Sequence, residues 1–373
     1  MSEPPNDPNR ESVPLLLART TSRIRLEAEA PDEPPTAGVA ERLTMAIRLP
    51  QARREVRRAI GYLRARLGAG GAVVAALLVL FAVFADVWAS DLPIACKVHG
   101  RVWLFPNVTH PTELVAMGGD AVAREAEWRV RAVVPFGPET RGPVEARPGG
   151  SHPFGTDREG RDVFARVMHG TRSYLVFAAA AVAVCLVLGG LLGAIAGLFG
   201  GPVDALVGRA IETVSAFPPL VLVLGVQAAV PQPTLATLFL AIALTRWPEW
   251  ARIVRAEVMQ VATSDYVLAA RAIGASPLRV LRRHIEPNVR GQLIVLAAAG
   301  IPAVVLIEAS LDFLRVGIPP GTASWGETMS EFRDATHAWW LLAFPGAFLF
   351  ATVVALNLVG EARREALDPR ARL

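Results

Sequence analysis

Charged side chains, and lysine above all, are scarce in this chain. Asp, Glu, Lys and Arg together make up 19% of the 373 residues, whereas about 25% is usual for a soluble domain. The single lysine, Lys97, lies in the sequence Cys-Lys-Val-His. No glycine-rich, phosphate-binding loop precedes it, so the chain has no P-loop. The composition therefore excludes a soluble enzyme, a disordered regulator and a P-loop ATPase that works by itself.

Cysteine is also nearly absent, since only Cys96 and Cys185 occur. Cys185 falls in the middle of a hydrophobic run and Cys96 beyond the end of another, so we expect no disulfide between them. No group of His and Cys residues has the spacing of metal ligands. We therefore expect no metal site.

The chain contains several long stretches without any charged residue, and 52% of its residues are hydrophobic. A helix needs about 20 apolar residues to cross a bilayer. Prolines interrupt helices, so the stretch 213–245 is expected to form two short spans joined at Pro231–Pro233. The other expected spans are 67–85, 173–203, 291–307 and one between Asp334 and Glu361. The sequence therefore predicts an all-α membrane protein with six transmembrane helices.

Composition also divides the chain into four parts. The stretch after the first span contains Trp, Pro and Gly together with charges of both signs, and its apolar clusters at 102–105 and 129–134 resemble strands. We expect this stretch to form a small, irregular subdomain. The N-terminal tail is rich in Pro, Glu and Ser and holds almost nothing to bury. The four parts are 1–40, a disordered cytoplasmic tail; 41–90, a basic flank and the first span; 91–150, an external subdomain; and 151–373, a core with the other five spans.

Arginine counts in the short loops predict the orientation, because cytoplasmic loops carry an excess of Lys and Arg. Residues 246–290 contain eight arginines and four acids, whereas 308–334 contain five acids and two arginines. The tail after Gly360 carries four arginines in 13 residues. With six spans, the basic segments all fall on one side. We therefore expect both termini and the segment 252–290 to be cytoplasmic.

This cytoplasmic segment contains signals for two short helices. Ser264 can cap a helix over 266–273, and Gly274 suits the left-handed residue that ends such a helix. Pro277 is typical of the first position of a second helix. Pro287 disfavours the continuation of that helix.

The second helix has an apolar side and a basic side. Leu278, Leu281 and Ile285 recur at helical spacing, while arginines occupy the other faces. Two interpretations stay open. The segment is either an anchor at the lipid surface or a docking element that inserts into a groove of a partner protein.

The same segment resembles the EAA coupling loop of ABC importer permeases, in the version found in dipeptide and oligopeptide permeases. That version reads Glu-Ala-Ala-x3-Gly, followed by His-Ile-Leu-Pro-Asn. Leu268 stands where the family usually has Glu, and Glu286 where it has Leu. The matching residues are Ala269, Ala270, Gly274, His284, Ile285, Pro287 and Asn288. The resemblance implies that these residues, with Arg279 and Arg282, dock an ATPase subunit.

Further stretches are similar to motifs of the same family and occur in the same order. The resemblance covers roughly 150–373 and the first span, and it implies the six-helix permease fold of the second, "C-type" subunit. The stretches are His152–Asp162, similar to His-Pro-x-Gly-Thr-Asp-x-x-Gly-Arg-Asp; Ala216–Pro219, similar to a Phe-Pro break; Ser310–Gly317 with Ser324–Gly326; and Phe344–Gly346 with Asn357–Arg370.

The resemblance implies a set of partners and a location. The chain would pair with a sister permease, two ATP-binding-cassette subunits and an extracytoplasmic solute-binding protein, within the lipid bilayer of a bacterial cytoplasmic (inner) membrane. The chain itself would have no catalytic residue and would bind no cofactor, because ATP and magnesium would bind to the partner subunits. No nucleic acid would be involved. The implied cargo is a di- or oligopeptide, with nickel, an antibiotic peptide or a sugar as alternatives. A function of another class is a stand-alone secondary transporter, which would need ionisable groups buried in the membrane.

Three groups of residues outside the coupling loop are candidates for specific roles. Gly155, Asp157, Gly160, Arg161 and Asp162 form either a capped turn beneath the binding protein or a direct contact with it. Phe217, Pro218 and Glu308 are candidates to line the path, with the external interface as the other possibility for Glu308. The glycines at 189, 190, 193, 197, 200 and 201 indicate close helix packing.

Overall fold

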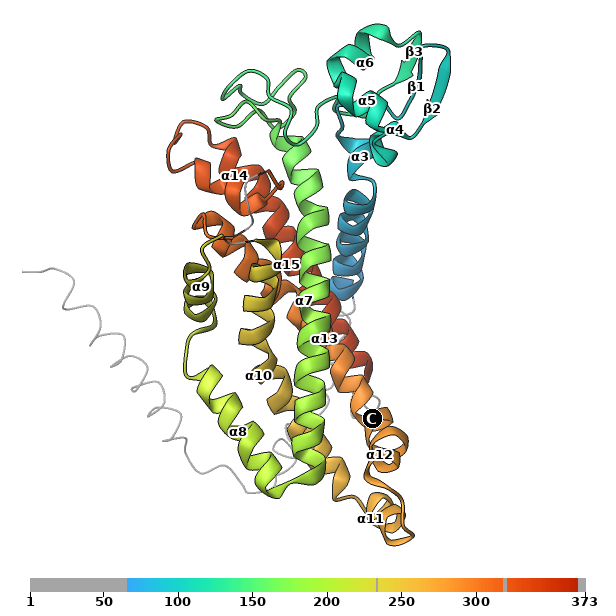
Figure 1. Cartoon of the computed structure of the whole chain (residues 1–373), viewed down its shortest axis with the longest axis vertical. Coiled ribbons are helices and arrows are strands. Elements are labelled where there is room, and N and C mark those ends of the chain that lie inside the picture. Colours follow the sequence, from blue (N-terminus) through green and yellow to red (C-terminus); the bar gives the residue numbers. More distant parts are fainter. Residues whose placement is uncertain (1–65, 233, 318–320, 368–373) are drawn as a thin grey trace, which may run out of the picture. The chain divides into compact units, whose positions relative to one another are not determined.

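The computed structural model describes residues 66–232, 234–317 and 321–367. The expected tail at 1–40, the flank at 41–65 and the last residues of the C-terminal motif lie outside this part. Helices make up most of the described residues, and one small sheet accompanies them (Figure 1). The expected predominance of helix is thus confirmed.

The helices follow one another along the chain, starting with Arg66–Val83, which has no label in Figure 1. It is followed by α3 (Ala85–Trp88), α4 (Pro106–Thr109), α5 (Thr112–Met117), α6 (Gly119–Glu125), α7 (Val163–Phe199), α8 (Gly201–Ser215), α9 (Pro219–Ala229), α10 (Leu235–Ala262), α11 (Asp265–Ala272), α12 (Pro277–Val280), the π-helix η1 (Leu281–Ile285), α13 (Glu286–Phe313), α14 (Trp325–Glu331) and α15 (Trp340–Leu367).

Helix α7 packs along α10, and α13 packs against α7 and α15 (Figure 1). Gly189, Gly193 and Gly197 lie four residues apart and therefore share one face of α7. A Cβ atom added at Gly189 would lie 2.6 Å from the Cβ of Trp250, and one at Gly193 would lie 2.5 Å from the carbonyl oxygen of Ala251. The expected close packing is therefore confirmed at this face.

The other three glycines of that group behave differently. Gly190 has nothing within 4 Å of its ideal Cβ position. Gly200 and Gly201 have φ angles of 63° and 54° and form the turn between α7 and α8. Close packing is therefore not the reason for glycine at these positions.

Among the described residues, four helices are long and apolar enough to cross a membrane: Arg66–Val83, Val163–Phe199, Pro277–Phe313 and Trp340–Arg364. Helices α8 and α9 form a bent pair, with 83° between them, and count as a fifth candidate if the pair is one span. Each of these regions overlaps a stretch in which the sequence predicts a span. The structure thus supports several membrane crossings.

The stretch 213–245 differs from the expected pair of short spans. Its break at Pro231–Pro233 lies between the end of α9 and the start of α10. A second break separates α8 from α9 at Pro218, so the helix before Pro231 has only 11 residues. Helix α10 is not short, because it continues to Ala262 through Arg246 and the internal Pro248. A charged residue marks where the apolar stretch ends, but it does not end a helix.

Pro287 does not interrupt the helix either, and that expectation is wrong. It is the second residue of α13, and the backbone N–H just before it, that of Glu286, bonds to the carbonyl oxygen of Leu281 in the wider π-helical turn. The π-helix η1 leads directly into α13. As a result, residues 277–313 form one continuous helical segment of 37 residues.

The segment after the first span is more regular than expected. Strands β1 (Ala95–Val98), β2 (Arg101–Leu104) and β3 (Trp128–Val130) form an antiparallel sheet in the order β2-β1-β3. Three short helices, α4 to α6, lie between β2 and β3. Leu92, Cys96, Val98, Leu114 and Val122 form a separate small core. The strand-like clusters at 102–105 and 129–134 correspond to β2 and, over fewer residues, to β3.

Candidate functional site

The coupling segment consists of α11, α12 and η1, and two helices of the bundle hold it in place. Val267, Val280 and Ile285 are fully buried. They pack with apolar residues at the end of α10 and the start of α13, namely Val254, Val258, Ala262 and Val289. The segment is therefore a fixed extension of the bundle.

A sharp turn separates the two short helices of this segment. Helix α11 begins after Ser264 and ends within one residue of the expected boundary. Gly274 follows with φ of 89°, a backbone conformation that glycine adopts without strain. Helix α12 then starts at Pro277, as expected. An added Cβ at Gly274 would find nothing within 4 Å, so the turn is open on its outer side.

The apolar side chains of the segment point in two directions. Ile285 is buried and Leu281 is half-buried, whereas Leu278 is 57% exposed. The three residues of the expected apolar side therefore do not share one surface. Ile273 at the turn is 88% exposed, and Leu268 on α11 is 50% exposed. These exposed side chains form an apolar tip that nothing in the described part of the chain covers.

The matched coupling-loop residues divide into an inner and an outer set. Ala270 and Ile285 are buried and hold the segment to the bundle. His284 is half-buried, with its ring centroid 6.3 Å from that of Tyr266. The outer, exposed set is Ala269, Gly274, Arg279, Arg282 and Pro287.

A second cluster lies in the loop that leads into α7. Asp157 accepts hydrogen bonds from the backbone N–H groups of Glu159 and Arg161 at 2.9 and 2.8 Å, and from Nε of Arg161 at 2.6 Å. Asp162 caps α7 by accepting from the N–H of Ala165 at 2.8 Å. These contacts form the expected capped turn.

Two glycines permit the close packing of this turn. Gly155 has φ of 77°, and a Cβ there would lie 2.6 Å from the carbonyl oxygen of Ala146. Gly160 has φ of 79°, and a Cβ there would overlap the carbonyl oxygen of Gly142. Both positions therefore require glycine on two grounds, backbone conformation and space.

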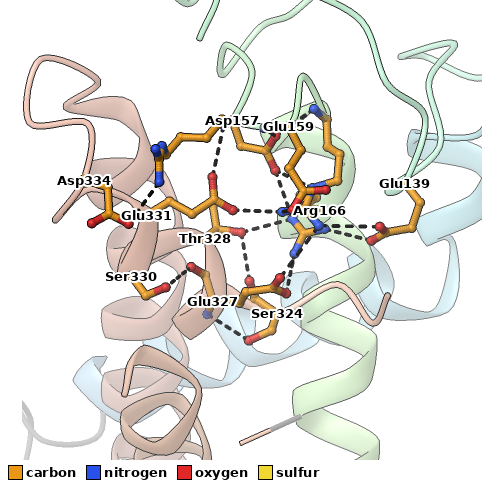
Figure 2. A network of polar contacts seen from close by, with 12 residues as sticks. Glu139, Asp157, Glu159, Arg166, Ser324, Glu327, Thr328, Ser330, Glu331 and Asp334 are labelled. Atoms are coloured by element: carbon orange, nitrogen blue, oxygen red, sulfur yellow. Dashed lines mark hydrogen bonds and ion pairs between the residues drawn. The ribbon is translucent and has the colours of Figure 1, made fainter. Parts of the chain in front are cut away.

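The turn is bound to α14 by a buried ionic network that has Arg166 near its centre (Figure 2). Arg166, in the first turns of α7, is 0% exposed. It donates to Glu327 at 2.7 Å, to Glu139 at 2.8 Å and to the hydroxyl of Thr328 at 3.2 Å. Arg161, also buried, donates to Glu331 at 2.8 Å. Residues about 160 to 170 positions apart in sequence thus form one cluster.

The electrostatics of the cluster follow from its burial. Burial alone would lower the pKa of Arg161, but Asp157, Glu327 and Glu331 outweigh that effect and raise it. Burial raises the pKa of Glu331, although Arg161 and Arg166 oppose the shift. Burial also raises the pKa of Asp162, against the cap of α7 and a 2.7 Å hydrogen bond from Nδ1 of His152. Arg161 therefore stays charged and holds α14 through the carboxylate of Glu331.

Arg166, Glu327 and Glu331 were not among the residues that the sequence marked as candidates. The only signal was the excess of acids over arginines at 308–334, which predicted orientation and not a specific contact. An ion network between distant segments depends on tertiary packing. No spacing within the sequence reports it.

The three candidate path residues lie in different places. Phe217 is 54% exposed and lies with Pro218 at the bend between α8 and α9. Glu308, in α13, is fully buried and lies in the wall of a cavity of about 710 Å3. The lining of that cavity comes from α7, α10, α13 and Thr322. The structure therefore does not bring Glu308 together with Phe217 and Pro218 at this cavity.

Comparison with known proteins identifies the family. Residues 189–373 match the model of the "Binding-protein-dependent transport system inner membrane component". A putative peptide transport system permease protein of Brucella abortus is 38% identical over 227 residues, which cover 61% of this chain and 76% of that protein. The oligopeptide transport system permease protein OppC of Bacillus subtilis is 37% identical, over 60% of this chain and 74% of its own length.

A third relative and one solved structure complete the comparison. The probable D,D-dipeptide transport system permease protein DdpC of Escherichia coli is 37% identical, over 60% of this chain and 75% of its own length. A solved amino acid ABC transporter chain covers 53% of this chain at 17% identity, and 93% of that chain is covered, with a TM-score of 0.43. The extent of the matches to relatives, together with several apolar helices, indicates a multi-pass inner-membrane protein. The chain belongs to the binding-protein-dependent transport system inner membrane component family, the permease subunits of ABC importers.

Proposed function

We propose that this chain forms, together with a sister permease, the path by which an ATP-driven importer moves di- or oligopeptides into the cell. An extracytoplasmic solute-binding protein delivers the peptide, and two ATP-binding-cassette subunits bind ATP and magnesium and supply the energy. The chain itself binds no cofactor. The names of the relatives above support peptide cargo, because all three are peptide, oligopeptide or dipeptide permeases.

The geometry of the coupling segment is the observation that carries this proposal. An anchor at the lipid surface would present one apolar side, but in this segment Ile285 packs inward while Ile273 and Leu278 project outward at a tight turn. Such a tip, with the exposed Arg279 and Arg282 beside it, fits a groove on a protein partner better than a flat lipid surface. We assign that groove to an ATP-binding-cassette subunit.

The continuity of the segment with α13 provides the means of coupling. Residues 277–313 are helical throughout, so the docking tip and a membrane-spanning helix are one mechanical element. When ATP draws the two partner subunits together, the tip moves with them and α13 tilts in the bundle. The path then opens toward one face or the other, as alternating access requires.

In this proposal the chain crosses the membrane six times, with both termini cytoplasmic. The apolar first half of α10 supplies a crossing in addition to the four long helices and the bent pair α8 and α9. The coupling segment and the C-terminal end of α15 then lie on the cytoplasmic side. The ionic network around Arg166 lies on the external side, where the turn at 155–162 faces the binding protein.

The test combines a pull-down with a substitution at the turn. The tagged chain, purified in detergent from its native membrane, is expected to retain a second permease and P-loop ATPases. Gly274→Asp is expected to weaken that assembly and to uncouple ATP hydrolysis from transport, because it adds strain and bulk at the docking tip. Gly100→Asp is the matched control, since Gly100 also has positive φ and open space but lies in the β1–β2 turn.

Two results would contradict the proposal. A chain that is recovered alone, intact and folded, would indicate a stand-alone secondary transporter. Normal transport in the Gly274→Asp variant would exclude this segment as the coupling loop. An equal defect in the Gly100→Asp variant would show that the loss reflects folding and not docking.

A further inference from the structure

Glu308 is a buried acid whose carboxylate has no hydrogen-bond partner among the described residues. The residue is 0% exposed. Within the part of the chain that the structure describes, neither carboxylate oxygen has a hydrogen-bond partner. An ionised carboxylate in a membrane-spanning helix is costly unless a cation or several donors accompany it. Two carboxylate oxygens without hydrogen bonds indicate that Glu308 can accept hydrogen bonds from a donor that is not among the described residues.

The neighbouring acid on the same helix does not share this feature. Asp312 lies one turn after Glu308 and accepts hydrogen bonds from the hydroxyls of Tyr174, at 2.6 Å, and Ser324. The fold thus supplies donors to one of the two acids and withholds them from the other. The contrast between two carboxylates on one face of α13 argues that the unpaired state of Glu308 is specific to that position.

The cavity beside Glu308 can hold a small molecule. Its volume is about 710 Å3, and sites for small molecules commonly measure about 300–1,000 Å3. Most of its wall is apolar, with Val176, Phe177 and Phe239 among the lining residues. Beside apolar walls an ion pair is stronger than it would be in bulk water, because the local dielectric is lower.

The cation in the cavity wall is already engaged and does not serve Glu308. Arg172 donates to the carbonyl oxygens of Ala82 and Val83 and, at 2.7 Å, to the carboxylate of Asp86. These bonds connect α7 to the first span. Among the described residues of the cavity wall, Arg172 therefore supplies no donor to Glu308, which leaves the acid open to a positively charged ligand.

A ligand that suits this site carries a positive charge and several hydrogen-bond donors. The rest of the ligand must be able to contact the apolar walls of the cavity. A primary ammonium group has three donors and no acceptor. We propose that Glu308 binds the free amino terminus of the peptide as it passes through the permease, by turning its carboxylate from the cavity wall toward the cavity. This inference rests on the proposed function, and it adds a substrate contact that belongs to this chain and not to the binding protein.

The experiment measures peptide binding to the purified complex of permeases and ATPase subunits, without the binding protein. The probes are trialanine and N-acetyltrialanine, which differ in the charged amino group. The wild-type complex is expected to bind trialanine about tenfold more tightly or better, as one charge-assisted hydrogen bond would give. Glu308→Gln is expected to remove this preference. Glu361→Gln, the same change at an exposed position near the end of α15, is expected to keep it.

A second variant covers the case in which Glu308→Gln does not assemble. Ala236 lies in the cavity wall at an exposed position of α10, so Ala236→Trp fills the cavity without disturbing buried packing. This variant is expected to lose trialanine binding. An unchanged preference for trialanine in either assembled variant would overturn the inference, and so would equal binding of the two peptides to the wild-type complex.

Uptake by the complete transporter separates this inference from the proposed function. If the wild-type importer with its binding protein accumulates trialanine but the isolated complex shows no preference for it, only the role of Glu308 fails. If the complete system does not import peptides, the proposed function fails and the inference fails with it.

Discussion

Replacement of Arg166 by methionine tests how much the buried ionic network contributes to the stability of the folded chain. The guanidinium is fully buried and bonds to Glu139, Glu327 and Thr328. Loss of one partner of a buried ion pair costs about 3–5 kcal/mol, because the other charge stays buried and unpaired. The side chains of Glu139 and Glu327 are 43% and 29% exposed, so water can reach them after the substitution. We therefore expect a loss near the lower limit, about 3 kcal/mol.

Arg158→Met is the matched control within the same cluster. Arg158 donates to Asp334 at 3.0 Å, but both side chains are more than 40% exposed. Such surface pairs contribute about 0–1 kcal/mol. The thermal midpoint of the purified complex, followed by tryptophan fluorescence, is expected to fall several times further for Arg166→Met than for Arg158→Met. Equal falls would refute the claim that burial determines the strength of this network.

Two further predictions concern packing and pH. Gly193→Val is expected to abolish accumulation of the folded chain, because its Cβ would lie 2.5 Å from a backbone oxygen of α10, whereas Gly190→Val, at an open position of the same helix, is expected to be tolerated. A hydrogen bond from Arg315 lowers the pKa of Asp334 from its ordinary value near 3.8. The stability that this carboxylate contributes is therefore present above that ordinary value and is lost as the pH falls through the lower, folded value. Asp334→Asn is expected to flatten this part of the acid denaturation curve, and an unchanged curve would contradict the assignment.

Local signals in the sequence predicted local structure well. The helix before Gly274, its end at that glycine and the start at Pro277 depend on a few adjacent residues, and the structure has them within one residue. The capped turn at 157–162 is also local, since Asp157 bonds within four residues of itself. Such features could be predicted because their energetics are settled by neighbours along the chain.

Prolines show where local reasoning fails. The same residue type breaks the chain between α9 and α10 but lies within α10 as Pro248 and within α13 as Pro302. Both internal prolines are buried, so the packing of these helices against their neighbours offsets the lost backbone bond. Pro287 is accommodated in another way, because it directly follows the π-helical turn of η1. The effect of a proline thus depends on tertiary contacts that a sequence pattern does not contain.

A continuous series of contacts connects the coupling segment to the ionic network. Helix α13 begins beside Ile285, which holds the segment to the bundle, and near its other end it carries Asp312. Asp312 accepts a hydrogen bond from Ser324, the residue that caps α14. Helix α14 then holds the turn before α7 through Glu331 and Arg161. A tilt of α13 that moves Asp312 must therefore either move α14 with it or break this buried hydrogen bond. Because a broken bond would leave a buried carboxylate short of a donor, joint movement costs less free energy, and ATP-driven motion at one end of α13 is expected to reach the turn at 155–162.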